Sequence, residues 1–546
     1  MSSLFDENLK TIFLSIGTSV IVLGIVSFLE LLRAEQMDEK EKTNLKIIEE
    51  GGIENIFKRR DLEEYKEIVY NAKKSIDITG YSLRGFYESN KDIILEKCEK
   101  YKNFLVRIIL VNPSSQFSEN REYIMGRRLA MDEKKFENVA VTQNNDNWET
   151  LTKRKTNLYG RKDDIRSEFA RDYTRVLHSL AYRRLKHKTQ VFFNAAGNDH
   201  ICTRIEHVQH VESVSNTVAK CLGLNEELTR AIAIAHDLGH APFGHQGESV
   251  IQKWTKEYLK KDFWHEQNGV YFVDNVELLE DNQRKLRNLD LTYAVRDGII
   301  SHCGEVDENA IRPRTELFDL KKFGKAGEYQ AATWEGCVVK LADKIAYLGR
   351  DIEDAIRLGY LSEGEMNTLR EMAQVHNQEA MNTTVIMHNM IIDLCNNSSV
   401  EKGLLLSKTM ADQLDAIKKF NQDKIYRNPR LDTFKKYSKL VLNEIFGTLL
   451  SFYDNCQGDI MVCLMKMKND EKKFVNDFAE WIVQYCTLNF KEPTYAWAKK
   501  ISDNCENKKI YMELSQRTQY IQAVVDFVAG MTDVYAINAF DELLRC

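Results

Sequence analysis

Histidines are concentrated in one part of the chain: ten of the 12 lie between His178 and His302. Within this stretch, residues 235–248 read AHDLGHAPFGHQGE and place the adjacent pair His236 and Asp237 just before two more histidines and a glutamate. Imidazole and carboxylate groups bind divalent metals, and imidazole also exchanges protons near neutral pH. The run therefore predicts a metal site that has its own acid and base groups.

A metal site needs ligands from several elements. Adjacent residues on a helix point about 100° apart, so His236 and Asp237 share one ion only near a helix end. Further candidates are His207, in TRIEHVQHVES, and Asp343, in the apolar segment VVKLADKIAYLG, where an unpaired carboxylate is costly to bury. Each residue alone has an ordinary structural explanation. Together, two His and two Asp suit Mn, Mg, Fe, Co or Zn and leave positions for water and substrate.

The elements that would position these residues are mainly helical. The chain has five prolines in 546 residues, which favours long helices. Asn225 before two glutamates is typical of a capped helix start, and the apolar run 231–235 that follows predicts a buried helix. Ser362 and Glu365 match a capping box. Residues 361–546 are predicted to be helical throughout.

The composition limits the partners and the compartment. A net charge of −6 argues against wholesale coating of nucleic acid, so nucleic acid is not indicated as a partner. The 11 cysteines are scattered and include no Cys-x-x-Cys pair. This distribution favours reduced thiols in a cytosolic environment over a disulfide framework or a thiolate zinc site.

One segment near the N-terminus predicts a membrane anchor. Residues 11–29 contain no charge. This run is long enough for one transmembrane helix, which we predict at residues 9–32. A signal peptide and a buried core helix are the alternatives. An acidic start and the lack of a clear cleavage pattern favour an uncleaved anchor. Positive residues follow the span, so we expect a single-pass membrane protein with its catalytic part in the cytoplasm.

Residues 50–115 are predicted to form a small α/β unit. Residues 75–80 alternate like a strand, and 104–111 form an apolar, β-rich run. The stretch AKKSIDITGYSLRGF resembles the first strand region of phospholipase D-like domains. The chain has no histidine before His178, so the His-x-Lys chemistry of those domains is absent and we interpret the unit as non-catalytic. The polar residues 116–160 are predicted to be a linker.

A second resemblance covers the histidine-rich region, with its segments in the family's order and spacing from about residue 160 to 360. These segments are RSEFARDYTRVLHSLAYRRLKHKTQVF (166–192), DHICTRIEH (199–207), AHDLGHAPFGHQGE (235–248), WHEQNG (264–269), LTYAVRDGIISH (291–302) and VVKLADKIAYLGRDIEDAIRLG (338–359). They resemble the HD-domain deoxynucleoside triphosphate triphosphohydrolases, which include bacterial dGTPases. The resemblance implies a mainly α protein, with an all-helical HD phosphohydrolase core at 161–360 and a helical C-terminal part of the catalytic domain at 361–546.

The resemblance also implies roles for individual residues. The implied metal ligands are His207, His236, Asp237 and Asp343. Catalytic roles near the phosphates fall to His240, His245, Glu248 and His265. Contacts to the phosphates or the sugar fall to Gln190, Arg204, Lys344, Tyr347 and Asp351. One divalent metal is expected per HD site, with Mn or Mg favoured. His210 stands where the family often has a glutamate, which can alter the surroundings of the metal.

The function expected from these observations is metal-dependent hydrolysis of dNTPs to a deoxynucleoside and triphosphate, with dGTP the best single substrate. An HD phosphohydrolase acting on other nucleotides or nucleic-acid ends is one alternative, and a non-catalytic nucleotide-sensing scaffold is another. The family often forms homo-oligomers, and an activating nucleotide is a further candidate partner. The combination of an anchor, a phospholipase D-like segment and a nucleotide hydrolase suggests a role in anti-phage defence.

Overall fold

The structure of the chain, a computed structural model, falls into two units, Met1–Ala130 and Met131–Cys546. The described residues are 75–80, 96, 105–110, 134–159, 164–192, 200–303, 309–373 and 383–545. The predicted membrane helix at 9–32 lies outside them.

The described part of the first unit is a pair of short strands. Strand β1 (Ser75–Gly80) pairs in parallel with β2 (Leu105–Leu110), and Ser75 lies opposite Leu105. Both strands fall where the alternating and β-rich runs predicted them.

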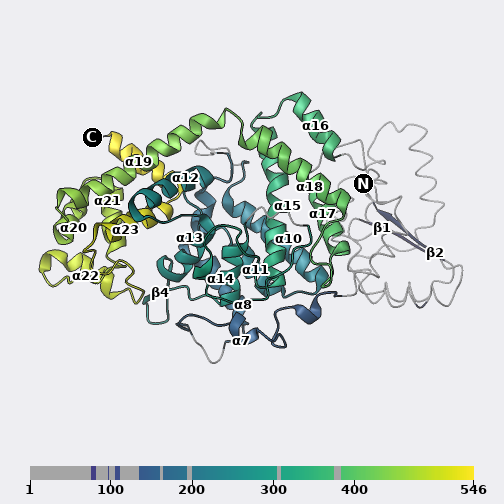
Figure 1. The fold of residues 1–546 in the computed structure, drawn as a ribbon, viewed down its shortest axis with the longest axis horizontal. Coiled ribbons are helices and arrows are strands. Elements are labelled where there is room, and N and C mark those ends of the chain that lie inside the picture. The colour runs from purple at the N-terminus through teal and green to yellow at the C-terminus, as the bar shows by residue number, and fades with distance from the viewer. Residues whose placement is uncertain are drawn as a thin grey trace, which may run out of the picture. The chain divides into compact units, whose positions relative to one another are not determined.

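The second unit is built almost entirely from helices (Figure 1), as the sequence predicted. Its first half contains η2 (Glu137–Val139), α7 (Trp148–Leu151), α8 (Glu168–His178), α9 (Leu180–Arg184), η3 (Leu185–His187), α10 (Arg204–Leu222), α11 (Glu226–Ala235), α12 (Gly244–Trp254), η4 (Thr255–Leu259), α13 (His265–Tyr271), η5 (Phe272–Val276), α14 (Tyr293–Ser301), η6 (Leu320–Lys322) and α15 (Trp334–Arg357). A short antiparallel hairpin, β3 (Leu278–Glu280) and β4 (Leu286–Asn288), precedes α14.

The named elements in the described residues of the second half are all helices. These are α16 (Glu363–Ala373), α17 (Thr383–Asn397), α18 (Lys408–Phe420), η7 (Asn421–Tyr426), α19 (Leu431–Asn455), α20 (Ile460–Lys468), α21 (Lys473–Ile482), η8 (Pro493–Tyr495), α22 (Ala496–Asp503), α23 (Arg517–Ala529) and α24 (Asp533–Leu544). Within the described residues, no single helix has both the length and the apolar composition to span a membrane. Helices α23 and α24 meet both criteria only when they are taken together, as a pair bent by 117°.

Helices α8, α10, α11, α14 and α15 pack together as the central bundle of this unit. Val208, Ile232, Ile299 and Val339, from four of these helices, are fully buried in it. The run 231–235 of α11 is buried along its whole length, as its apolar character predicted. A helix enclosed on all sides is a rigid support for the residues at its end.

The C-terminal helices form a second hydrophobic core around α19 and α23. Helix α12 joins this core by packing on α19, where Trp254 and Phe446 stack with ring centroids 4.3 Å apart. Since α12 also carries two of the predicted catalytic residues, the C-terminal core helps to fix the site. The C-terminal helices thus support the helix that carries His245 and Glu248.

Residues 134–159, which fall within the predicted linker, pack against the helical unit. Phe136 and Leu151 are buried, and the backbone N–H of Val141 donates to Glu335 at the start of α15 over 2.9 Å. The buried contacts make this segment part of the folded unit.

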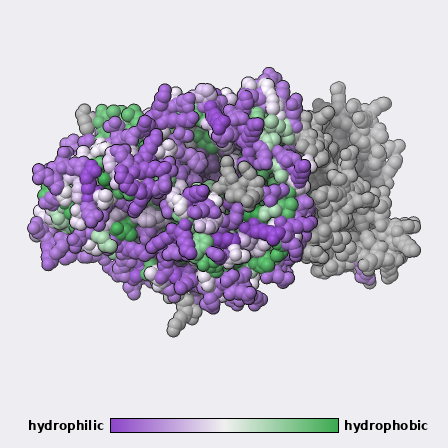
Figure 2. Space-filling view, viewed as in Figure 1, coloured by the Kyte–Doolittle hydropathy of each residue, from purple (hydrophilic) through white to green (hydrophobic). Residues whose placement is uncertain are grey.

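The face in Figure 2 is mainly hydrophilic, with small hydrophobic patches that are separated from one another.

Candidate metal centre and active site

Three predicted metal ligands from three elements converge on one point. His207 lies in the first turn of α10, His236 directly follows α11, and Asp343 lies within α15. Oδ1 of Asp343 is 2.9 Å from Nε2 of His207 and 3.8 Å from Nε2 of His236. Their ligand atoms all lie within 4.8 Å of one another, so one ion can bind all three after small adjustments. We call these three residues the metal cluster.

The end of α11 fixes the orientation of His236. Its Nδ1 atom lies 2.6 Å from the carbonyl oxygen of Ala233, so Nδ1 carries the hydrogen and donates it. The other nitrogen, Nε2, is buried and has no hydrogen-bond partner. An unpartnered buried acceptor is costly, and a divalent metal held by the cluster would satisfy it.

Asp237, the fourth predicted ligand, lies at the edge of the metal cluster. Its Oδ1 atom is 3.6 Å from Nε2 of His236 and 2.9 Å from Nδ1 of His240. Its Oδ2 atom accepts a hydrogen bond from Nη1 of Arg204 over 2.8 Å. Arg204, predicted to contact the phosphates, therefore also positions Asp237.

Both carboxylates are held in their ionised, metal-binding form. Burial raises the pKa of Asp343, but the hydrogen bond to His207 and the charges of nearby histidines outweigh it and lower the pKa to about 2. Burial also acts upward on Asp237, and the neighbouring histidines with Arg204 hold the pKa of its carboxyl well below the usual range. Deprotonated carboxylates are required for metal binding.

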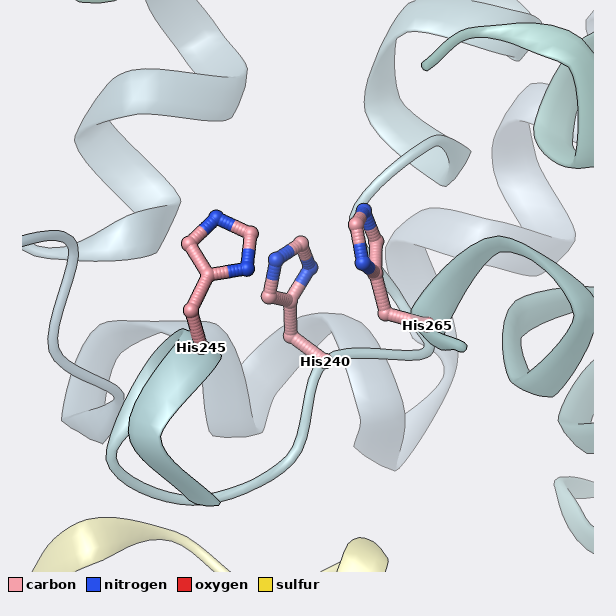
Figure 3. Close-up of side chains that lie close together, drawn as sticks. All are labelled: His240, His245 and His265. Carbon is pink, nitrogen blue, oxygen red and sulfur yellow. The ribbon is translucent and has the colours of Figure 1, made fainter. Parts of the chain in front are cut away.

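Three further histidines stand side by side next to Asp237, with His240 between the other two (Figure 3). His240 lies in the turn after the His-Asp pair, His245 lies in the first turn of α12, and His265 opens α13. The ring centroid of His240 is 3.8 Å from that of His265 and 5.6 Å from that of His245. We call His240, His245 and His265 the histidine row.

Glu248 connects two members of the histidine row. Its Oε2 atom lies 3.1 Å from Nδ1 of His245 and 3.2 Å from Nδ1 of His265, and its Oε1 atom accepts the backbone N–H of His265. Burial raises the pKa of Glu248, but its bonds to these histidines outweigh burial and lower it. For His265 burial acts downward, and the neighbouring Glu266 and Glu248 raise the pKa to about 9. The resemblance in the sequence had implied catalytic roles for both His245 and Glu248.

Two glycines permit the close packing of this region. A Cβ atom on Gly239 would lie 2.0 Å from the carbonyl oxygen of His265, so a side chain there would push α13 away. Gly244 has a φ of +59°, and its Cβ would lie 3.2 Å from Nη2 of Arg204 and 3.6 Å from the carbonyl oxygen of Gln190. The segment that carries Gln190 can therefore approach the start of α12.

The remaining predicted substrate residues lie mainly along α15. Asp343, Tyr347 and Asp351 are four residues apart and share one face, and Lys344 is adjacent to the first of them. Burial raises the pKa of Asp351 to about 7, and the hydroxyl of Tyr426 donates to its Oδ2. Tyr426 belongs to η7, where the sequence had no functional signal. The Oε1 atom of the fifth predicted residue, Gln190, is buried without a hydrogen-bond partner.

Two supporting residues were not predicted. Asp533, the first residue of α24, accepts the backbone N–H of Phe243 over 2.7 Å and that of Thr189 over 2.8 Å. Nζ of the buried Lys188 donates to the carbonyl oxygens of His240 and Ala529. The end of α23 and the start of α24 thus bind the segments that carry Gln190 and the histidine row. The contacts of Asp533 span 290 and 344 residues, so no local pattern indicated them.

The end of α14 brings two more polar side chains into this region. The ring centroid of His302 is 4.9 Å from that of His236, although the sequence had placed His302 in none of the site roles. Burial and the neighbouring His236 lower the pKa of His302 to about 4. Sγ of Cys303 lies 3.4 Å from Nε2 of His265, and burial together with Glu266 raises the pKa of this thiol. The cysteine distribution in the sequence had favoured reduced thiols over a disulfide framework or a thiolate zinc site.

A helical bundle that presents a His-Asp pair at a helix end, with a histidine and an aspartate from neighbouring helices, defines an HD-domain protein. The HD domain model matches residues 204–348, which contain all four predicted ligands. The chain belongs to the family of deoxyguanosinetriphosphate triphosphohydrolase-like proteins. The resemblance of the histidine-rich region to this family and the mainly α fold class are therefore both confirmed.

Curated relatives align over most of their length. One from Desulfatibacillum aliphaticivorans is 36% identical over 298 residues, which cover 54% of this chain and 76% of the relative. One from Caldanaerobacter subterraneus subsp. tengcongensis is 33% identical, and the match covers 61% of this chain and 86% of the relative. One from Clostridium perfringens strain 13 is 31% identical, and the match covers 70% and 88%. Each carries the name "Deoxyguanosinetriphosphate triphosphohydrolase-like protein".

Proposed function

We propose that the chain hydrolyses dNTPs to a deoxynucleoside and inorganic triphosphate in a metal-dependent reaction, with dGTP as its first candidate substrate. The observation that carries this proposal is the metal cluster beside a hydrogen-bonded His245–Glu248 pair. Membership of a family named for triphosphohydrolase activity supports the choice of substrate class. A metal and a proton-transfer pair together provide what the cleavage of a phosphate ester requires.

His207, His236, Asp237 and Asp343 would hold one divalent metal. Such a metal supplies Lewis-acid activation of water and of a phosphate oxygen. The two nitrogens and the carboxylate oxygens suit Mn or Mg, which we favour, and also Fe, Co and Zn. The unpartnered Nε2 atom of His236 is the feature of the chain that best supports this ligand set.

The histidine row supplies the proton chemistry in this proposal. Ionised Glu248 accepts a hydrogen bond from Nδ1 of His245, which leaves Nε2 to exchange a proton with the attacking water or the leaving oxygen. The side chain of His245 is 70% exposed, so substrate can reach it. His240 and His265 would face the phosphates, and His265, with its raised pKa, provides positive charge for them.

The other predicted residues would recognise the rest of the substrate. Arg204 and Lys344 would neutralise phosphate charge, and Gln190 and Asp351 would contact the sugar. Tyr347, half-buried on the same face of α15 as Asp343, would stack on the deoxyribose and disfavour a 2′-hydroxyl. This arrangement predicts a preference for dNTPs over NTPs.

Product analysis tests the proposal directly. The purified chain is incubated with each dNTP, singly and mixed, in the presence of Mn²⁺ or Mg²⁺. Release of intact triphosphate and deoxynucleoside from dGTP is expected, and stepwise release of orthophosphate would favour an HD phosphohydrolase with another substrate. Faster turnover in mixtures would identify an activating nucleotide. If an Asp237→Ala variant kept the full biological effect of the chain, a non-catalytic scaffold would be favoured.

We further propose that residues 9–32 anchor the enzyme to a membrane with its catalytic part in the cytoplasm, and that it acts in anti-phage defence. The uncharged N-terminal run and the fused phospholipase D-like segment support these two ideas. Fractionation of cells expressing the chain, with and without residues 9–32, tests the anchor. Constant dNTP pools during phage challenge would contradict the role in defence.

A homo-oligomer, which we also propose, would be detected by light scattering.

A further inference from the structure

A second group of metal-binding side chains lies next to the metal cluster. His265, His302 and Cys303 offer two imidazoles and a thiol, and their ligand atoms lie within 4.8 Å of one another. Sγ of Cys303 is 3.4 Å from Nε2 of His265. The group combines the first residue of α13 with the two residues that follow α14. None of the three belongs to the proposed ligand set of the HD site.

Both histidines of this group are oriented as metal ligands usually are. His265 directs Nδ1 to the carboxylate of Glu248, so its Nε2 atom faces the Cys303 sulfur. His302 directs Nδ1 to the carbonyl oxygen of Ile299 over 2.7 Å, which leaves Nε2 as the atom that can bind a metal. In metal sites the second nitrogen of a ligating histidine is typically bound in this way by a carboxylate or a carbonyl. The histidines are thus pre-positioned by groups outside the donor set.

A buried carboxylate beside the group has one oxygen without a hydrogen bond, which favours a further cation close to it. Glu266 is only 1% exposed, and its Oε2 atom has no hydrogen-bond partner. The nearest cationic candidate is Nδ1 of His265 at 3.4 Å, which is already shared with Glu248. A buried oxygen of this kind is costly unless a positive charge lies close to it.

We propose that His265, His302 and Cys303 form a second metal site, which takes a thiophilic divalent cation of the zinc class and inhibits the enzyme when it is occupied. On binding, the Cys303 thiol and the Nε2 atom of the protonated His265 each release a proton to solvent, and the thiolate sulfur and this nitrogen coordinate the metal. Imidazole and thiolate donors favour zinc over Mg²⁺ and Mn²⁺, which prefer oxygen. The inhibitory part rests on the proposed function, because a metal on Nε2 of His265 would withdraw this residue from the phosphates.

Cobalt spectroscopy distinguishes this site from the HD site. The full chain is stripped of metal with a chelator and titrated with Co²⁺. A sulfur-to-cobalt charge-transfer absorption is expected, which the HD ligands cannot produce because they contain no sulfur. Mass spectrometry should find two equivalents of Zn²⁺ per parent chain and one in Cys303→Ser. This variant should keep its basal activity with Mn²⁺, and half-inhibition by zinc should need at least about tenfold more metal.

Cys221→Ser is the matched control, because Cys221 is half-buried like Cys303 and lies outside the group. It should retain the charge-transfer absorption and the zinc inhibition. If Cys303→Ser does not fold, His302→Gln should remove the second zinc equivalent instead. The proposal is overturned if the parent lacks the absorption, or if Cys303→Ser keeps it. The absorption and the zinc content are measured without turnover, so they decide on the site even if the chain proves not to hydrolyse dNTPs.

Discussion

The metal cluster and the histidine row lie side by side but are held in different ways. His207 and Asp343 of the metal cluster project from regular positions within helices of the central bundle, and His236 directly follows a third. The row comes instead from a turn and from the first turns of α12 and α13, and it is held by Glu248 and Asp533. The cluster thus depends on the core of the bundle, whereas the row depends on individual long-range hydrogen bonds.

This difference separates metal binding from catalysis. Substitutions in the cluster should remove the metal and the activity together. Substitutions in the row or its supports should reduce the activity while the metal content stays unchanged. A variant that mixed the two effects would show that the regions are one cooperative site.

The largest effect is expected for Asp343→Ala. The substitution removes the oxygen that lies 2.9 Å from His207 and one charge of the metal site. We expect loss of bound metal, measured by mass spectrometry, and a fall in dGTP hydrolysis of at least about 1,000-fold, or roughly 4 kcal/mol in transition-state stabilisation. Glu353→Gln, on the same helix and partly exposed, is the control that should retain both. Full metal content in Asp343→Ala would show that Asp343 is not a ligand.

A smaller loss, with the metal retained, is expected for His245→Ala. Removing a general acid or base typically lowers the rate by about 100- to 10,000-fold. Glu248→Gln should lose less, because the amide oxygen can still accept a hydrogen bond from Nδ1 of His245. The pH profile of kcat should lose one limb in His245→Ala but not in Ser249→Ala, a neighbouring exposed control. A profile that His245→Ala leaves unchanged would assign the proton transfer elsewhere.

Asp533→Asn tests whether the long-range support positions the row. The amide replaces one acceptor oxygen with a donor, which opposes the N–H of either Phe243 or Thr189. We expect kcat to fall about tenfold with the metal content unchanged, since small misplacements of catalytic groups slow reactions. The effect should be much smaller when His245→Ala is already present. Val534→Ala, the exposed neighbour, should be neutral, and equal losses in both backgrounds would argue against positioning.

The sequence could predict the parts of this comparison that are local. The His236–Asp237 pair, the His245–Glu248 spacing and the Asp343-to-Asp351 face are all contained in single segments. The helix starts were also local: Asn225 caps α11 through Leu228, and the Ser362–Glu365 capping box is confirmed by a 2.9 Å bond. The mainly α fold class and the family could both be predicted from such local segments.

The remaining features depend on tertiary contacts. Asp533 reaches the row across the C-terminal core, and Tyr426 reaches Asp351 from η7. Cys303 meets His265 only because α13 packs on α14. A single sequence does not show which distant residues meet, and ordinary aspartate, tyrosine and cysteine side chains give no local signal.

The pH dependence of stability contrasts two aspartates of α15. The pKa of Asp343 is lowered to about 2, whereas that of Asp351, which faces the neutral hydroxyl of Tyr426, is raised to about 7. Since the folded pKa of Asp351 exceeds its value of 3.8 in the unfolded chain, the folded protein holds a proton that the unfolded chain has released. Its contribution to stability is therefore complete below about pH 4 and is lost as the pH rises through 7.

Asp351→Asn, which mimics the protonated form, should remove this pH dependence. The melting temperature of the variant relative to the parent should be higher at pH 8 than at pH 5. The difference corresponds to a free energy of unfolding of a few kcal/mol at most, at roughly 1.4 kcal/mol per pKa unit. Asp432→Asn, at an exposed position, should show no such change. If Asp351→Asn behaved like this control, Asp351 would be ionised in the folded protein like Asp343, and these two positions of α15 would not differ in charge.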